Sequence, residues 1–140
     1  MNVWGKEVNS CDTCYLSRLF EDSTSGTDIR CGWNNLYIFD AYEHSYIHKD
    51  CPFSKPITSE VIESYGFKNC NFTINSNFTK YSKSIDNISH WLLWYNIEEN
   101  VYTIEKVVGG MYLAPFIKFV GKINNPVELE FILKSLGIVE

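Results

Sequence analysis

The stretch of sequence that decides the fold is residues 88–108, which contain two strand-forming runs joined by a short polar break. The first run is Ile88-Ser-His-Trp-Leu-Leu-Trp-Tyr-Asn-Ile97, the break is Glu98-Glu-Asn100, and the second run is Val101-Tyr-Thr-Ile-Glu-Lys-Val-Val108. Aromatic and β-branched residues are enriched in strands, and a three-residue connection is common between antiparallel neighbours. The sequence therefore predicts a β-hairpin with two acidic residues at its turn.

Further strands and one short helix are predicted around this hairpin. Residues 72–75 and 78–81 have strand composition and can form one pair, and residues 116–120 form a last strand. The segment 57–66 has the features of a short helix, because Thr58 can cap its first amides and Gly66 can end it.

The closing helix is the clearest element of the sequence. Asn125 can act as its N-cap, Pro126 suits the first helical position, Glu128 occupies the capping-box position and Gly137 ends it. One face of this helix is apolar, at positions Leu129, Ile132, Leu133 and Leu136. The sequence thus predicts an α+β fold, with a small antiparallel sheet flanked by two helices in residues 57–140.

Residues 1–53, upstream of the prolines at 52 and 56, form a cysteine module that is predicted to pack with residues 57–140 as one unit. We expect the polar segment 21–28 to be an exposed loop, and residues 36–39 and 41–47 to be two short strands. The second strand would bring His44, His48 and Cys51 toward a common site. We therefore expect this module to be a zinc-stabilised hairpin and loop that precedes the sheet.

The four cysteines of this module have the spacing of a metal site. Two thiolates three positions apart can reach one ion across a tight turn, and a second pair from further along the chain completes a tetrahedron. The predicted Zn²⁺ ligands are Cys11, Cys14, Cys31 and Cys51. His48 is an alternative fourth ligand. Free buried cysteines and a redox role for the first pair are the other interpretations.

Composition and charge limit the classes of function. The 140 residues contain 12 Lys and Arg against 17 Asp and Glu, which gives a formal net charge of −5. An acidic surface repels phosphate backbones, so direct nucleic-acid binding is disfavoured and a protein partner with a basic surface is favoured. The sequence shows neither a secretory signal nor an apolar run long enough for a bilayer, so no membrane contact and a cytoplasmic location are expected.

The predicted hairpin is also the candidate partner-binding site. Trp91 and Trp94 can anchor a protein interface, while Glu98 and Glu99 at the turn can steer a basic partner. The alternative is that the aromatic residues are core, and strand alternation leaves open which tryptophan is exposed.

No catalytic motif accompanies the cysteines. A catalytic zinc site keeps an open position and usually has a nearby glutamate base, and only Glu43 beside His44 offers one. The main prediction is therefore a non-enzymatic binding protein with a structural zinc. The alternatives are a zinc-containing nucleic-acid-binding or transcription-linked adaptor, and a small metal-dependent nuclease or hydrolase.

A resemblance adds a biological setting to these predictions. The segment Ile57-Thr-Ser-Glu-Val-Ile-Glu-Ser-Tyr-Gly-Phe67, the aromatic-rich strands and the closing helix resemble short accessory proteins of Bacteroidetes phages and mobile elements. This resemblance covers residues 57–140. It implies a genomic context in which accessory proteins often act on host machinery, including antiviral defence. We therefore expect an anti-CRISPR-like inhibitor of a CRISPR effector or another defence nuclease, in the cytoplasm of a host bacterium. The resemblance brings no catalytic residues.

Overall fold

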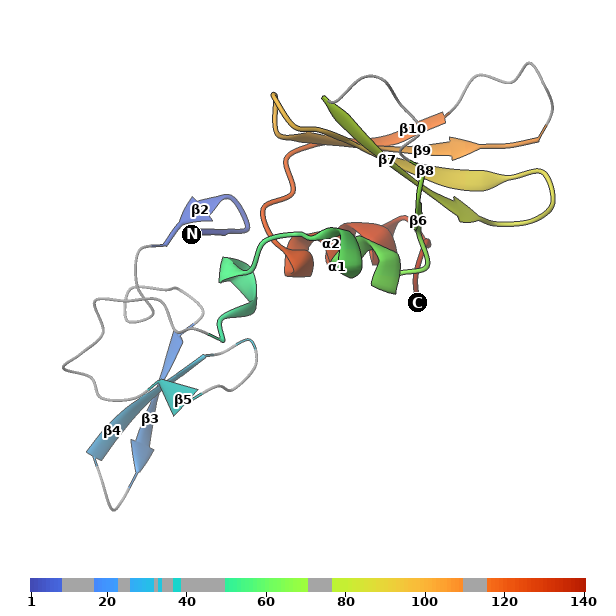
Figure 1. Cartoon of the computed structure of the whole chain (residues 1–140). Coiled ribbons are helices and arrows are strands. Elements are labelled where there is room, and N and C mark those ends of the chain that lie inside the picture. The colour runs from blue at the N-terminus through green and yellow to red at the C-terminus, as the bar shows by residue number, and fades with distance from the viewer. Residues whose placement is uncertain are drawn as a thin grey trace. The chain divides into compact units, whose positions relative to one another are not determined.

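The chain divides into two units between Lys55 and Pro56. A computed structural model describes residues 1–8, 17–22, 26–31, 33, 37–38, 50–70, 77–109 and 116–140 (Figure 1). Unit 1 is Met1–Lys55 and unit 2 is Pro56–Glu140. The fold class is α+β, as the sequence predicts, because unit 2 combines two helices with an antiparallel sheet.

Unit 1 consists of short antiparallel strands. Strands β1 (Asn2–Val3) and β2 (Lys6–Glu7) are joined by Trp4 and Gly5, which both have positive φ angles, of 49° and 81°. This is the backbone geometry that two-residue hairpins require. A second sheet has the order β3-β4-β5, with β3 at Ser17–Asp22, β4 at Gly26–Cys31 and β5 at Tyr37–Ile38, and a short 3₁₀ helix, η1, spans Pro52–Ser54.

The expectation of an exposed loop at residues 21–28 is wrong. Most of this segment belongs to the hairpin of β3 and β4, in which Glu21 pairs with Thr27 and Asp22 pairs with Gly26. Polar composition was a poor guide here, because the backbone ladder of a hairpin does not depend on apolar side chains. The predicted strand at 41–47 lies outside the described residues, whereas β5 overlaps the one predicted at 36–39.

Unit 2 contains one antiparallel sheet with the strand order β10-β9-β8-β7-β6. The predicted hairpin is confirmed as β8 (His90–Asn96) and β9 (Val101–Val107). The remaining strands are β6 (Lys68–Asn69), β7 (Phe78–Ser84) and β10 (Phe116–Gly121). The last of these matches the predicted strand at 116–120, while the predicted strand at 72–75 lies outside the described residues.

Both predicted helices of unit 2 are confirmed, and both lie on the same side of the sheet (Figure 1). Helix α1 (Ser59–Ser64) has Thr58 as its N-cap, whose hydroxyl accepts a hydrogen bond from the Val61 N–H. Helix α2 (Pro126–Ser135) begins at Asn125, whose Oδ1 accepts a bond of 3.0 Å from the Glu128 N–H. The expected stops at Gly66 and Gly137 have φ angles of 88° and 72°.

The helices and the sheet enclose one apolar core. Leu129 and Leu133 of α2 are fully buried, and Ile132 and Leu136 pack at the edge of the core. The sheet residues of this core share one face, which we call the helix-covered face: Tyr81, Trp91, Leu93, Tyr102 and Ile104. Since successive strand residues alternate between faces, the residues between them form the opposite, outer face.

Candidate functional site

The predicted metal site lies in unit 1, and the structure describes two of its four cysteines. Cys31 ends β4 and is partly exposed, whereas Cys51 precedes η1, is buried and has its Sγ 3.6 Å from the Met1 Sδ. Neither of these two cysteines forms a disulfide. Cys11, Cys14 and His48 lie outside the described residues. Within the described ranges no three His, Cys, Asp or Glu side chains form a group that could hold a metal ion.

The fifth cysteine belongs to the other unit. Cys70 directly follows β6, and its Sγ lies 3.1 Å from the Ser82 Oγ of β7. Its backbone N–H donates to the Lys80 carbonyl oxygen, which continues the ladder between β6 and β7. Cys70 is therefore a residue at the edge of the unit 2 sheet and not part of the cysteine module.

The two candidate tryptophans of the hairpin face opposite sides of the sheet. Trp91 is 8% exposed and belongs to the core of unit 2, so it is not available as an anchor for a partner. Trp94 is half-buried on the outer face, where the Phe78 ring packs edge-on against it at 6.4 Å between centroids. The Lys80 Nζ lies 4.7 Å from the centroid of the Trp94 ring, a distance typical of a cation–π contact.

The outer face is hollowed beside Trp94. A shallow depression of about 290 Å³ is lined by Phe78, Trp94, Thr103 and Glu105. Ile117 and Val120 of β10 are exposed, and their strand pairing places them on this same face. Sequence reasoning missed Phe78 and Glu105, although strand alternation and the pairing with β8 would have located them.

The turn of the hairpin presents the two predicted carboxylates. Glu98 and Glu99 are exposed, and their backbone N–H groups both donate to the Asn96 Oδ1, at 3.1 and 3.2 Å. The last residue pair of the ladder is Asn96 with Val101, so the connection has four residues and not the predicted three. The Ile97 N–H donates to the Asn77 carbonyl oxygen, which extends the pairing of β8 with β7 by one residue.

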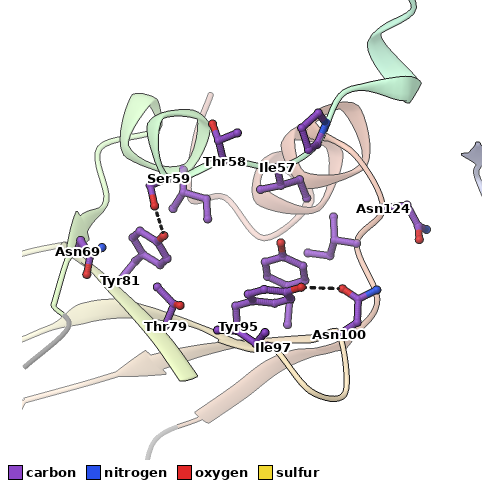
Figure 2. A pocket seen from close by; sticks show the side chains of 14 residues that line it. Ile57, Thr58, Ser59, Asn69, Thr79, Tyr81, Tyr95, Ile97, Asn100 and Asn124 are labelled. Carbon is purple, nitrogen blue, oxygen red and sulfur yellow. Dashed lines mark hydrogen bonds between the residues drawn. The ribbon is translucent and has the colours of Figure 1, made fainter. Parts of the chain in front are cut away.

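A larger cavity lies on the helix-covered side of the same hairpin. It has a volume of about 520 Å³ and is bordered by the start of α1, by β7, and by the end of β8 and the start of β9 (Figure 2). Three tyrosines from three neighbouring strands line it, namely Tyr81, Tyr95 and Tyr102. We call this cavity the tyrosine cleft. The sequence analysis did not identify it.

The hydrogen bonds of the cleft fix two of the three tyrosines. The Tyr81 hydroxyl lies 2.7 Å from the Ser59 Oγ, and the Tyr95 hydroxyl donates to the Asn100 Oδ1 at 3.0 Å (Figure 2). The Tyr95 and Tyr102 rings stack with centroids 4.5 Å apart, because the two residues are direct partners across β8 and β9. Asn100 has a φ angle of 53°, a left-handed conformation that asparagine tolerates better than most residues.

Tyr102 differs from the other two tyrosines. It is 5% exposed, and none of the described residues provides a hydrogen-bond partner for its hydroxyl. Burial, followed by the neighbouring Tyr95 and Tyr81, raises the pKa of Tyr102 well above its ordinary value of 10.0. The hydroxyl therefore stays protonated and can act as a donor at physiological pH. A buried hydroxyl without a partner costs roughly 1–3 kcal/mol.

The lining of the cleft carries no formal charge among the described residues. Its polar groups are the hydroxyls of serine, threonine and tyrosine and the amides of asparagine, and isoleucines form the rest of the wall. A volume of this size lies within the range of small-molecule sites. Chemically the cleft can bind, but it offers neither an acid–base pair nor an activated nucleophile.

A second group of aromatic residues lies in unit 1. The rings of Trp4, Trp33 and Phe53 lie 5.3–6.2 Å apart between centroids, and both tryptophans are partly exposed. The cluster packs η1 against the β1–β2 turn.

Comparisons with known proteins do not identify a functional site in this chain. None of the helices in the described part of the chain is long and apolar enough to cross a membrane. No family model matches the chain, and neither a curated protein nor a solved structure does.

Proposed function

We propose that this protein acts by binding another protein, without catalysis, through the outer face of the unit 2 sheet. The observation that carries this proposal is the position of Trp94. It is a large aromatic residue, half-buried on the face opposite the helices and adjacent to the exposed Phe78. Tryptophan is among the residues that contribute most to protein interfaces, and it acts best in a pocket that a partner can desolvate.

The surroundings of Trp94 support contact with a protein. Phe78, Ile117 and Val120 are between 38% and 61% exposed, so several large apolar side chains share the outer face. Apolar groups that gather on one surface mark interaction sites more often than scattered ones do. Among the described residues, no helix covers this face (Figure 1).

The charges near Trp94 support a partner with a basic surface. Glu105 lines the depression next to Trp94, and Glu98 and Glu99 are exposed at the end of the same hairpin. A basic side chain of the partner would take the place of Lys80, whose Nζ lies 4.7 Å from the centroid of the Trp94 ring, and would set its own charge near Glu105. With a net charge of −5, direct binding of nucleic acid is disfavoured.

We further propose a structural zinc ion in unit 1, with Cys11, Cys14, Cys31 and Cys51 as ligands and His48 as the alternative fourth ligand. Its support is the spacing of the four cysteines in the sequence. Four thiolates around zinc form a closed site, so the metal would stabilise the fold without reacting.

The resemblance to accessory proteins of phages and mobile elements supports a specific biological role. In this role the protein inhibits a host defence complex, such as a CRISPR effector, in the cytoplasm of the host bacterium. The alternatives are a nucleic-acid-binding adaptor, which the acidic charge disfavours, and a metal-dependent nuclease or hydrolase, for which the described residues contain no group that could hold the metal ion.

The role is tested in bacteria whose CRISPR effector targets a test phage. Expression of the wild-type chain should restore plaque formation, and Trp94→Ala should abolish this effect. Phe131→Ala is the matched control, because Phe131 is an exposed aromatic residue on α2, on the other side of the sheet. An equal loss with both variants would contradict the assignment to the outer face. No rescue by the wild-type chain would contradict the inhibitor role.

Binding is then measured with the purified effector complex at two salt concentrations. Glu98→Lys with Glu99→Lys should slow association and reduce its dependence on salt, whereas Trp94→Ala should speed dissociation. Gel-shift assays with bare DNA and RNA test the adaptor alternative. Tight, salt-sensitive retention of nucleic acid without protein would overturn the proposal, as would zinc-dependent turnover of a substrate.

The zinc is tested by elemental analysis of protein purified without added metal. We expect about one zinc per chain, and loss of structure in unit 1 on chelation, because the binding energy of such sites is folding energy. Cys31→Ser should release the metal and Cys70→Ser should not. Full metal occupancy in the Cys31→Ser variant would exclude the proposed ligand set.

A further inference from the structure

The tyrosine cleft contains hydrogen-bonding capacity that its own residues do not use. The Tyr102 hydroxyl has no partner among the described residues, although its side chain is 95% buried. Buried polar groups in proteins are almost always hydrogen-bonded, and an exception indicates a function that a ligand or water completes. Phenylalanine would fill the same space without this cost.

Other donor groups of the cleft have O–H or N–H hydrogens that are not used in the hydrogen bonds of the described structure. In the pair of Ser59 and Tyr81 only one hydroxyl donates to the other, so one O–H remains available. Asn100 accepts from Tyr95 through its Oδ1, which orients its Nδ2 and leaves both hydrogens of that nitrogen without a partner in the described structure. The cleft therefore presents a preorganised set of neutral donors around an apolar wall.

The chemistry of this lining excludes several classes of ligand. An anion would find no cation in the described lining, and a cation would find no carboxylate. Burying either charge without a partner is unfavourable. A purely apolar ligand would remove the hydroxyl and amide groups from water without replacing their hydrogen bonds, which is also unfavourable.

We propose that the tyrosine cleft binds a neutral carbohydrate. Sugar hydroxyls can pair with the Tyr102 and Ser59 hydroxyls and with the Asn100 amide, and each hydroxyl both donates and accepts. The C–H faces of a sugar ring can pack against Tyr95 and the isoleucines of the wall. The volume of about 520 Å³ accommodates more than one sugar ring.

This site is independent of the proposed protein interface. The cleft lies on the helix-covered side of β8 and β9, whereas Trp94 and Phe78 lie on the outer face. Variants of the two sites can therefore be compared directly. Loss of protein binding in Trp94→Ala should leave carbohydrate binding unchanged, and loss of carbohydrate binding in Tyr102→Phe should leave protein binding unchanged.

The proposal is tested by NMR titration of the ¹⁵N-labelled full chain with four probes. They are maltotriose and tri-N-acetylchitotriose as neutral sugars, glucose 6-phosphate as an anion, and spermidine as a cation. At least one neutral sugar should shift the amides of residues that line the cleft. The proposal is overturned if millimolar concentrations of both sugars leave the cleft unshifted, or if only the charged probes shift it.

Two variants then test the mechanism of recognition. Tyr102→Phe should weaken sugar binding by roughly tenfold, the loss of one buried hydrogen bond, while the melting temperature stays equal or rises. Asn100→Gly removes the amide, preserves the left-handed backbone and should also weaken binding. If both variants bind the sugar as tightly as the wild type, the cleft is not the site.

Discussion

Trp91 and Trp94 lie three residues apart on β8, yet one supports the core and the other lies on the outer face of the sheet. Trp91 faces the helices with Leu93, whereas Trp94 faces away from them with Phe78. An odd separation along a strand always gives opposite faces. The two tryptophans therefore have different roles. Substitution of Trp91 should mainly affect stability, and substitution of Trp94 should mainly affect binding.

The largest loss of stability is expected on substitution of Trp91, the buried tryptophan of this pair. Trp91→Ala should lower the free energy of unfolding of unit 2 by about 3–5 kcal/mol, because it leaves a large cavity in the core. Trp94→Ala should cost much less, since it removes one edge-on ring contact and one cation–π contact, each worth roughly 0.5–1.5 kcal/mol. Urea denaturation of both variants measures the difference, and equal losses would contradict the assignment of the two faces.

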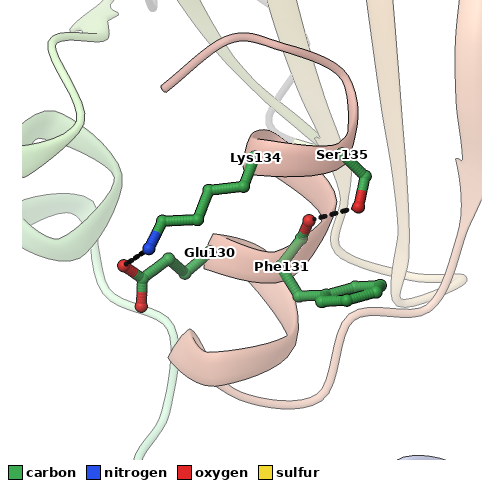
Figure 3. Close-up of polar contacts among 4 residues, drawn as sticks. All are labelled: Glu130, Phe131, Lys134 and Ser135. Atoms are coloured by element: carbon green, nitrogen blue, oxygen red, sulfur yellow. Dashed lines mark hydrogen bonds and ion pairs between the residues drawn. The ribbon is translucent and has the colours of Figure 1, made fainter. Parts of the chain in front are cut away.

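Helix α2 offers a second comparison, between a buried residue and its exposed neighbour in the sequence. Leu133 is fully buried, and Leu133→Ala should cost about 2–5 kcal/mol. Its neighbour Lys134 is exposed, with its Nζ 3.0 Å from a Glu130 carboxylate oxygen, as Figure 3 shows. Lys134→Ala should cost no more than about 0.5 kcal/mol, the typical value of an exposed pair at this spacing. Thermal denaturation measures both, and similar small effects would show that α2 is peripheral.

Local hydrogen bonds hold both ends of α2. The Asn125 Oδ1 bonds the Glu128 N–H, and the Glu128 carboxylate in turn accepts from the Asn124 N–H and the Asn124 Nδ2. At the other end, the Gly137 N–H donates to the Lys134 carbonyl oxygen and the Ile138 N–H donates to the Leu133 carbonyl oxygen, with Gly137 at a φ angle of 72°. These local bonds fix where the helix begins and ends. The buried stripe determines how strongly it is held.

The elements of unit 2 were predictable because their signals are local. The caps at Thr58 and Asn125, the stops at Gly66 and Gly137, and the alternation within residues 88–108 each depend on neighbours in the sequence. The orientation of the hairpin was not predictable, because a sheet with aromatic residues on both faces does not indicate which face the helices cover. Only the position of α1 and α2 distinguishes Trp91 from Trp94.

The tyrosine cleft could not be predicted for a related reason. Its walls come from segments between residues 56 and 124 that meet only in the folded unit. The pairing of Tyr95 with Tyr102 depends on the four-residue connection, because the predicted three-residue connection would have paired Tyr95 with Thr103. The position of Tyr81 depends on the register of β7. Whether the Tyr102 hydroxyl finds a hydrogen-bond partner depends on the residues that surround it in the folded unit.

Tyr102 should also make the stability of unit 2 depend on alkaline pH. Its pKa is raised on folding, so the folded chain retains a proton that the unfolded chain loses above about pH 10. Stability is therefore unaffected below pH 10 and should fall as the pH rises further, by at most about 1.4 kcal/mol per pH unit for this group. Urea titrations at successive pH values measure the slope.

The control for this effect is Tyr102→Phe, which should flatten the alkaline slope. Tyr65 has a pKa raised in the same direction, chiefly by burial, so some slope should remain in the variant. An unchanged slope would show that Tyr102 ionises as easily in the folded chain as in the unfolded one.

The smallest effect on stability is expected at the turn of the hairpin. Glu98 and Glu99 are exposed, and the bonds that hold the turn come from their backbone N–H groups and the Asn96 side chain, not from their carboxylates. Charge reversal at both positions should therefore change the free energy of unfolding by no more than about 0.5 kcal/mol, the usual range for surface substitutions. Asn96→Ala is the matched variant, because it removes the acceptor of both turn bonds and should destabilise the hairpin more. If the charge reversal unfolds the protein while Asn96→Ala does not, these carboxylates hold the fold, and their assignment to partner recognition fails.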